Sequence, residues 1–372
     1  IDGNGMRGIP LRCPYLYTIK RNKSVSDFSC LQTYYTRTFG EGNSKNFSEA
    51  LISQYWIIPE TSIISKNFQE FSKNFTKKYN SEVLMHYKTT EALLDFIKKS
   101  PTAFQATAEM EKKFAENGYQ LLSEREHWKL QPGGKYIVTR NHSALIAFSI
   151  PKKECRKFHV VASHSDSPAF KIKENPEMRV ENAYTKLNVE GYGGMLMAPW
   201  FDRPLSVAGR VIVRCDGSLK EELVNIDRDL VMIPSLAIHM NREANKGVSY
   251  NPQKDLLPLL GCGDSKPELL NIIAEELKVS TEDILAHDLF LYNRMEGTIW
   301  GADREFVSAP RLDDLQCAFA SMEGMLAGKK EESIAVHCVL DNEEVGSGTK
   351  QGAASTFLKD TLRRINDGLG RT

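Results

Sequence analysis

Residues 159–168, HVVASHSDSP, are the stretch that decides the fold. The first five residues form a short, largely apolar run, which predicts a β-strand covered on both faces, as the central strands of parallel α/β sheets are. His164 and Asp166 follow this run directly, and both side chains can bind metals or protons. Open α/β sheets carry their sites at the carboxyl ends of their strands. We therefore expect an α/β fold with a site beginning at His164.

Two further clusters have the same placement. Asp313-Asp314 stands at the start of a predicted helix over residues 312–326, and residues 341–347, DNEEVGS, follow a predicted strand over residues 333–340. Each cluster alone also fits a structural role, because acidic residues cap helices and adjacent glutamates occupy solvated faces. Three such clusters in one α/β frame make a functional site as good an explanation as these structural ones.

The residue types suit a hydrolase that uses two metal ions. His164 offers an imidazole to a borderline cation such as zinc, and Asp313 has two carboxylate oxygens with which to bridge two ions. One glutamate of the pair Glu343 and Glu344 can bind metal, while the other takes a proton from water. Asp166 can hold the imidazole in place.

The organisation changes three times along the chain. Residues 1–84 are rich in Ser, Asn, Tyr and Lys and receive no assignment. Residues 85–171 and 306–372 show an α/β pattern, and we expect them to form one catalytic domain. Residues 172–305 are interpreted as a second unit inserted into it. Strands are expected in both parts, at residues 136–140, 143–150, 159–163, 180–189, 205–214, 230–233 and 333–340.

Composition excludes several classes of protein. The 372 residues contain 48 Lys+Arg and 48 Asp+Glu, so net charge gives no reason to expect a nucleic-acid or anionic-membrane partner. A long apolar run without charges is absent from the sequence, which argues against a transmembrane helix. The 7 cysteines form no CxxC pair, which favours a reducing compartment, and we expect a cytoplasmic location.

Four runs carry a family resemblance. Residues 163–168, 200–203, 308–314 and 341–347 resemble the motifs of the aspartyl aminopeptidases, in the same order along the chain. The similarity extends from about residue 85 to about residue 357. It implies a mixed-sheet α/β catalytic domain of the zinc exopeptidase type, interrupted by an inserted, mainly β dimerisation domain.

The resemblance implies an aminopeptidase that releases N-terminal amino acids, preferentially Asp or Glu, from peptides. It implies two zinc ions per site, with cobalt or manganese as other metals, and a tetrahedral dodecamer built from dimers. His164 and Glu344 would each bind one metal, and Asp313 would bridge both. Glu343 would be the general base, and Asp166 would support His164.

The resemblance also places His239 in a neighbouring subunit's active site, where it would bind substrate. Members of the family continue beyond the Glu-Glu motif and supply a further Asp ligand, a His ligand and basic groups that recognise the acidic substrate. This sequence ends at Thr372. We therefore expect a C-terminally truncated family member, and expect residues 85–372 alone to be poorly active.

Two alternatives stay open at this point. The first is a related dinuclear aminopeptidase of broad or neutral specificity, because the groups that recognise the substrate side chain lie largely outside the sequence. The second is an inactive truncated fragment that only assembles through its inserted domain. The sequence does not separate either from an enzyme that prefers acidic residues.

Overall fold

The computed structural model describes residues 86–263, 267–329 and 331–371. The interpretation of residues 1–84 lies outside these ranges. The chain divides into two compact units, residues 1–88 and residues 89–372, and the elements below all belong to the second. Residues 89–99 of this unit are helical.

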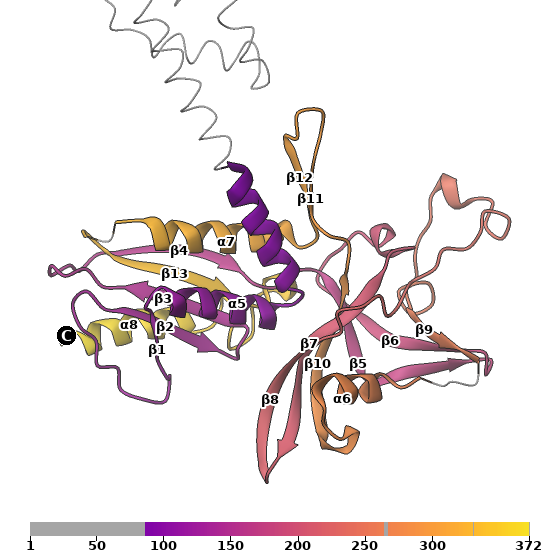
Figure 1. Ribbon diagram of the computed structural model, residues 1–372, viewed down its shortest axis with the longest axis horizontal. Helices are drawn as coiled ribbons and strands as arrows, with labels where there is room; N and C mark the ends of the chain where they lie inside the picture. The colour runs from indigo at the N-terminus through magenta and orange to yellow at the C-terminus, as the bar shows by residue number, and fades with distance from the viewer. Residues whose placement is uncertain (1–85, 264–266, 330, 372) are drawn as a thin grey trace, which may run out of the picture. The chain divides into compact units, whose positions relative to one another are not determined.

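A five-stranded mixed sheet forms the first part of this unit (Figure 1). In spatial order its strands are β1 (Gln120–Leu121), β2 (Lys135–Arg140), β3 (Ala144–Ser149), β13 (Ile334–Leu340) and β4 (Phe158–His164). Strand β13 runs antiparallel to β3 and parallel to β4, with Leu340 opposite His164. Two segments far apart in sequence therefore end side by side.

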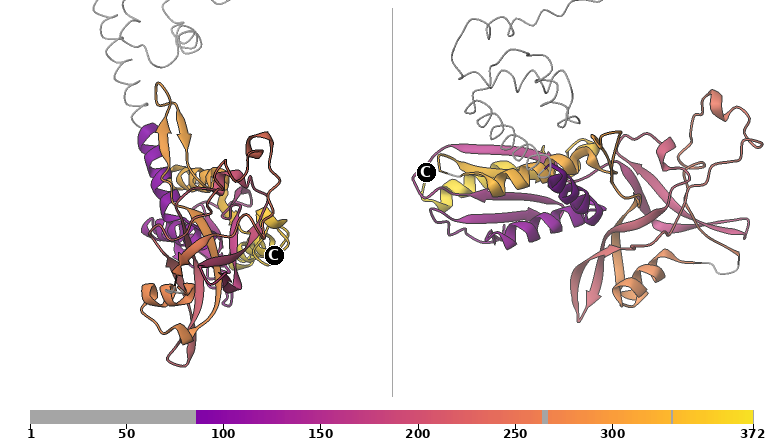
Figure 2. Two further views of the ribbon diagram at one scale, coloured as in Figure 1. Left: turned by 90° about the vertical axis from the view of Figure 1, so that its right-hand side faces the viewer. Right: turned by 45° about the horizontal axis from the view of Figure 1, so that its top comes forward.

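Helices cover both faces of this sheet (Figure 2). They are α5 (Ala103–Glu116), α7 (Leu312–Ala327) and α8 (Phe357–Gly368). Successive strand residues point to opposite faces, so Ile137 packs in one core with α5 and α7, while Val138 packs in another with α8. The mixed α/β architecture expected from the sequence is confirmed.

A second sheet lies between β4 and β13 in the sequence. It has six strands, and every pairing between them is antiparallel. In spatial order the strands are β8 (Ser218–Asn225), β7 (Leu205–Cys215), β10 (Ile284–Asn293), β5 (Ala169–Val180), β6 (Tyr184–Tyr192) and β9 (Leu259–Cys262). Helix α6 (Leu269–Leu277) packs in the core of this sheet, and a hairpin of β11 (Thr298–Trp300) and β12 (Phe306–Ser308) follows.

Three expectations from the sequence were wrong. Residues 230–233 do not form a strand, because Val231, Met232 and Ile233 make only isolated bridges in the described chain, to Leu205, Leu259 and Phe201. Residues 180–189 do not form one strand, because Glu181 and Asn182 adopt positive φ angles of 49° and 54° and reverse the chain between β5 and β6. Strand β4 is not covered on both faces, since Val160 is 40% and Val161 55% exposed. Within the described residues β4 pairs only with β13, at the edge of its sheet. The domain boundaries stay predictions.

Buried polar contacts join the two sheets. Gln105 of α5 donates from Nε2 to the carbonyl oxygens of Gly209 and Val224, at 2.9 Å each. The Arg210 guanidinium lies 4.4 Å from the centre of the Phe104 ring and donates to the carbonyl of Asn141. These contacts hold the second sheet against the first.

No helix among the described residues has the length and apolar character needed to cross a bilayer.

His337 gives a prediction about stability. It lies in β13 at 1% exposure, 5.3 Å from the Phe114 ring, and neither ring nitrogen has a hydrogen-bond partner in the described part of the chain. Burial lowers the pKa of His337 to about 3. Unfolded His takes a proton near pH 6.5 and the folded residue does not, so stability should fall as the pH drops below about 6.5.

We expect His337→Leu to remove about 2 kcal/mol of the stability difference between pH 7.5 and pH 5. It should also raise stability at pH 7.5 by about 1 kcal/mol, because an unsatisfied buried polar group is lost. Urea unfolding at both pH values measures these effects. His159→Leu, at an exposed position of β4, is the matched control. Equal pH dependence in His337→Leu and in the wild type would contradict the prediction.

Candidate metal centre

The position of His164 follows from the end of β4. Ser165, the next residue, donates from its backbone nitrogen to the carbonyl of Leu340 at 2.8 Å, and its hydroxyl donates to the carbonyl of Ser143 at 2.6 Å. The backbone nitrogen of His164 donates to Asp314 Oδ2 at 3.2 Å. The strand end is thus fixed on both sides of the imidazole.

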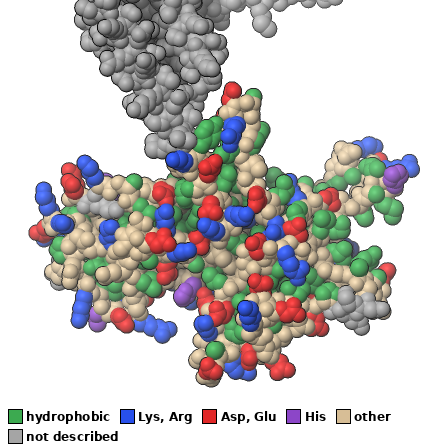
Figure 3. Space-filling model, in the orientation of Figure 1, with side chains coloured by type: hydrophobic (Ala, Val, Ile, Leu, Met, Phe, Trp, Pro, Cys, Tyr) green, Lys and Arg blue, Asp and Glu red, His purple; other side chains and the backbone are tan. Residues whose placement is uncertain are grey.

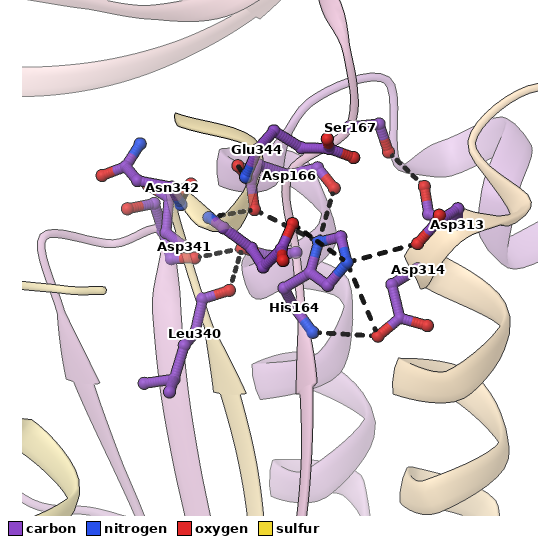
Figure 4. A network of polar contacts seen from close by, with 12 residues as sticks. His164, Asp166, Ser167, Asp313, Asp314, Leu340, Asp341, Asn342 and Glu344 are labelled. Carbon is purple, nitrogen blue, oxygen red and sulfur yellow. Dashed lines mark hydrogen bonds and ion pairs between the residues drawn. The ribbon is translucent and has the colours of Figure 1, made fainter. Parts of the chain in front are cut away.

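One side of the His164 ring faces carboxylates (Figure 4). His164 Nε2 lies 3.2 Å from Asp313 Oδ1, 3.9 Å from Asp314 Oδ2 and 4.0 Å from Glu343 Oε2. Two groups of residues in the described chain could hold a metal ion, and His164 belongs to both. Asp313 and Asp314 complete one group, and Glu343 and Glu344 the other, with ligand atoms within 4.8 Å of one another.

The other side of the ring faces Asp166. His164 Nδ1 lies 3.1 Å from the Asp166 carbonyl oxygen and 3.3 Å from its Oδ1. In the neutral ring, a proton on Nδ1 is donated to Asp166, and the lone pair of Nε2 points towards Asp313 and Glu343. An acidic or carbonyl partner on one nitrogen is the usual support for a histidine that binds metal through the other.

Electrostatics tie His164 and Asp166 together. Burial acts to lower the pKa of His164, but the hydrogen bond to Asp166 and the charges of Asp166, Asp314 and Glu343 raise it to about 9. Burial acts to raise the pKa of Asp166, but hydrogen bonds from His164, Tyr192 and the Glu344 backbone lower it overall. Without a bound cation, the imidazole is therefore protonated at neutral pH.

Glu343 and Glu344 lie in a short 3₁₀ turn, Glu343–Val345, directly after β13. Asn342 precedes the turn with a left-handed φ of 60°. The backbone nitrogens of Glu343 and Glu344 donate to Asp166 Oδ1 and Oδ2, at 3.2 Å each. Burial and the neighbouring charges of Asp166, Asp313 and Glu343 raise the pKa of Glu344, against the opposing effect of His164.

The start of α7 supplies the remaining carboxylates. Arg311, just before the helix, has a left-handed φ of 58° and donates to the carbonyl oxygens of Ser100 and Ile97 at 3.0 Å each. Ser167 donates from Oγ to the Asp313 carbonyl at 2.8 Å. The Asp313 side chain is 84% exposed, whereas that of Asp314 is 15% exposed. Asp313 is thus held by its backbone while its carboxylate stays accessible.

The imidazole nitrogen and the carboxylate oxygens of this cluster fit a zinc site. Zinc binds imidazole nitrogen and carboxylate oxygen, and catalytic zinc sites leave a position open for water or substrate. The Glu343 side chain is 56% exposed, so the carboxylate cluster opens to solvent. A cavity of about 520 Å³ adjoins the cluster. It is lined by residues that follow strands of the first sheet, including Asp166, by residues of the second sheet, including Phe290, and by Asp313 and Trp200.

The structure brings together five of the six residues singled out from the sequence. His164, Asp166, Asp313, Glu343 and Glu344 meet in this cluster, although their individual roles stay predictions. His239 is exposed in a turn of the second sheet's connections and belongs to neither group of candidate ligands in the described residues. Its proposed action on a neighbouring subunit stays a prediction.

Sequence reasoning missed three members of the site. Asp314 was quoted in its motif but given no role, although its carboxylate accepts a hydrogen bond from the His164 backbone. Asn342 lies in the 341–347 motif without an expected role, and Tyr192 lies outside all four motifs, yet the Tyr192 hydroxyl donates to Asp166 Oδ2 at 2.7 Å and accepts from Asn342 Nδ2 at 2.8 Å. The only signal for Tyr192 was its place in a Gly-Tyr-Gly-Gly run after a predicted strand.

Comparison with known proteins identifies the family. Residues 96–372 match the family model described as "Aminopeptidase I zinc metalloprotease (M18)". A "Probable M18 family aminopeptidase 2" of Clostridium acetobutylicum is 47% identical over 281 residues, covering 73% of this chain and 65% of the relative. The chain thus spans less than two thirds of that relative's length.

Comparison with solved structures supports the same family. The chain is similar to a structure titled "Cryo-EM structure of the Ape4 and Nbr1 complex", with 35% identity, a TM-score of 0.72, and coverage of 75% of this chain and 59% of the other. It is also similar to the "mApe1 dodecamer" of S. cerevesiae, with 26% identity, a TM-score of 0.66, and coverage of 75% and 66%. The resemblance drawn from the sequence motifs is confirmed, and the chain belongs to the M18 family of zinc metallopeptidases.

Proposed function

We propose that this protein is a metallo-aminopeptidase that removes N-terminal residues from peptides with water activated by two metal ions. The observation that carries the proposal is the gathering of four carboxylates around His164, in two candidate ligand groups whose ligand atoms lie within 4.8 Å of one another in each group. Since one imidazole nitrogen binds one ion, carboxylates not used with His164 would hold the second. The description of the matched family as a zinc metalloprotease supports zinc as the metal.

The chain's own residues would divide the work. His164 Nε2 and the Glu344 carboxylate would each hold one metal, and Asp313 would lie between the two. Asp314, whose Oδ2 is 3.9 Å from His164 Nε2, is a further candidate ligand beside them. When bound, the zinc ions would polarise the scissile carbonyl and make water more acidic. Glu343 would take a proton from the attacking water and return it to the leaving amine.

The substrates proposed are peptides with N-terminal Asp or Glu, as the motif resemblance implies. The name of the Clostridium relative gives no residue preference, so the alternative of broad or neutral specificity stays open. The second alternative, an inactive fragment that only assembles, is less well supported. Assembly alone gives no reason for His164, Asp313 and Glu344 to lie close together.

We also propose that the protein forms a homo-oligomer and is located in the cytoplasm. One solved neighbour is titled a dodecamer. An arm formed by residues 234–256 exposes apolar side chains, including Leu236 at 71% and Met240 at 76%, and Figure 3 shows hydrophobic groups on this arm. Large exposed apolar patches mark interfaces. Cys155, Cys215, Cys317 and Cys338 are free thiols, which supports a reducing compartment.

The proposed reaction is tested on the complete gene product with the p-nitroanilides of Asp, Glu, Leu and Ala. We expect Asp and Glu anilides to be hydrolysed fastest. We expect Glu343→Gln to lower kcat by about 10²–10⁴-fold with metal content unchanged, because the proton acceptor is lost while the proposed ligands His164, Asp313 and Glu344 remain. Glu276→Gln, at an exposed position of α6, is the control and should retain full activity.

Other outcomes would support one of the alternatives or contradict the role given to Glu343. Faster hydrolysis of Leu or Ala anilide supports the broad-specificity alternative. A fully metal-loaded protein that hydrolyses none of the four anilides supports the assembly-only alternative. Undiminished turnover by Glu343→Gln would contradict the role given to this residue.

Metal binding should depend steeply on pH. A proton occupies His164 below pH of about 9, because its pKa is raised to about 9, and this proton must leave before Nε2 binds metal. We expect zinc affinity to rise with pH by up to about tenfold per unit between pH 6.5 and 9. Competition with a chelator at several pH values measures it, while NMR follows the His164 ring in the metal-free protein.

Asp166→Asn tests the cause of this dependence. The change removes the carboxylate that raises the pKa of His164, so the imidazole should lose its proton at lower pH. The pH range over which zinc affinity rises should shift down with it. An affinity that is constant between pH 6.5 and 9 in the wild type would show that His164 does not bind the metal.

A further inference from the structure

The geometry points to Tyr192 and Gly193, at the end of β6 in the second sheet, as the residues that position the Glu343–Glu344 turn. The second sheet would then be part of the active site and not only an assembly module. The link to catalysis rests on the proposed function. The positioning itself is a property of the metal-free chain.

Tyr192 makes two hydrogen bonds into the first part of the fold. Its hydroxyl donates to Asp166 Oδ2 at 2.7 Å and accepts from Asn342 Nδ2 at 2.8 Å. Its ring packs edge-on against Phe290 of β10, with ring centres 5.4 Å apart and planes at 81°. The contact with β10 therefore helps to aim the hydroxyl at two residues beside the proposed ligands.

Asp166 connects the Tyr192 hydroxyl to the backbone of Glu343 and Glu344. It is 3% exposed, so water does not replace a lost donor easily, and its two oxygens accept from the backbone nitrogens of Glu343 and Glu344 at 3.2 Å each. Asn342 is held on its other side, because its Oδ1 accepts from Thr349 Oγ1 at 2.7 Å and from Gln351 Nε2 at 2.8 Å. The turn is thus fixed between the two sheets.

Gly193 provides an independent observation on the same loop. Its φ is +76°, and a Cβ at this position would lie 2.9 Å from Glu344 Cβ and 3.3 Å from the Glu344 carbonyl oxygen. Only a residue without a side chain lets the loop approach this closely. At Gly194, the next residue, φ is not positive, and an added Cβ would meet no atom within 4 Å. The close approach is specific to Gly193.

Two pairs of variants test the inference on the full chain. Tyr192→Phe removes only the hydroxyl, and Tyr184→Phe, at a half-exposed position of the same strand, is its control. Gly193→Ala introduces the clash with Glu344, and Gly194→Ala is its control. Amide hydrogen exchange of Glu343 and Glu344 in the metal-free protein is the first measurement, and zinc affinity by chelator competition is the second.

We expect both amides to exchange about tenfold faster in Tyr192→Phe and in Gly193→Ala, because the acceptor carboxylate or the turn itself is displaced. We expect zinc affinity to fall about 10–100-fold, as for other residues that orient metal ligands. Both controls should match the wild type. If Gly193→Ala does not fold, Tyr192→Phe decides alone, since it deletes a single oxygen atom.

Unchanged exchange of Glu343 and Glu344 in Tyr192→Phe would overturn the inference. So would an equal rise in exchange throughout β3, because that would show a general loss of stability. Faster exchange in the variants of a chain that binds no zinc would uphold the positioning and refute the proposed metal site. Zinc binding by the wild type, together with unaltered exchange in Tyr192→Phe, would uphold the proposed metal site and refute the positioning role of Tyr192.

Discussion

The parallel pairing of β4 with β13 is the constraint on which the site depends. It sets Leu340 opposite His164, so that the residues following both strands emerge at one edge of the sheet. Ser165 reinforces this register by donating to the Leu340 carbonyl. A shift of one residue would turn every side chain of the strand to the opposite face. His164 would then no longer face Glu343, and Asp166 would lose the backbone donors of the turn.

The sequence predicted this arrangement because strand ends are local features. An apolar run followed by His-x-Asp, and another followed by Asp-Asn-Glu-Glu, are visible without knowing which strands are neighbours. Parallel strands in one sheet then bring such ends together. The edge position of β4 was not predictable in this way, since an apolar run does not reveal how many strands pair with it. The reversal at Glu181 and Asn182 was missed because Asn182 is a single turn-forming residue with no Gly or Pro beside it.

Long-range contacts explain what sequence reasoning missed in the site itself. Tyr192 is 26 residues from Asp166 and 150 from Asn342, and it reaches them from a different sheet. No periodicity or spacing relates such residues. They become neighbours where the second sheet lies against the first, and the contacts of Gln105 and Arg210 help to hold it there. The part of the site that binds protons or metals is thus readable from motifs, whereas the part that orients it depends on the packing of whole sheets.

Charge balance gives the metal proposal its physical basis. The carboxylates of Asp166, Asp313, Asp314 and Glu343 surround one imidazole, and in the absence of an ion this ring supplies a single positive charge. The same field raises the pKa of His164, and burial together with like charges raises that of Glu344. Divalent cations would satisfy these carboxylates and release the proton of His164. Acidic groups with this arrangement are costly to maintain unless positive charge is bound among them, so the cluster is better explained by cations than by the stability of the fold.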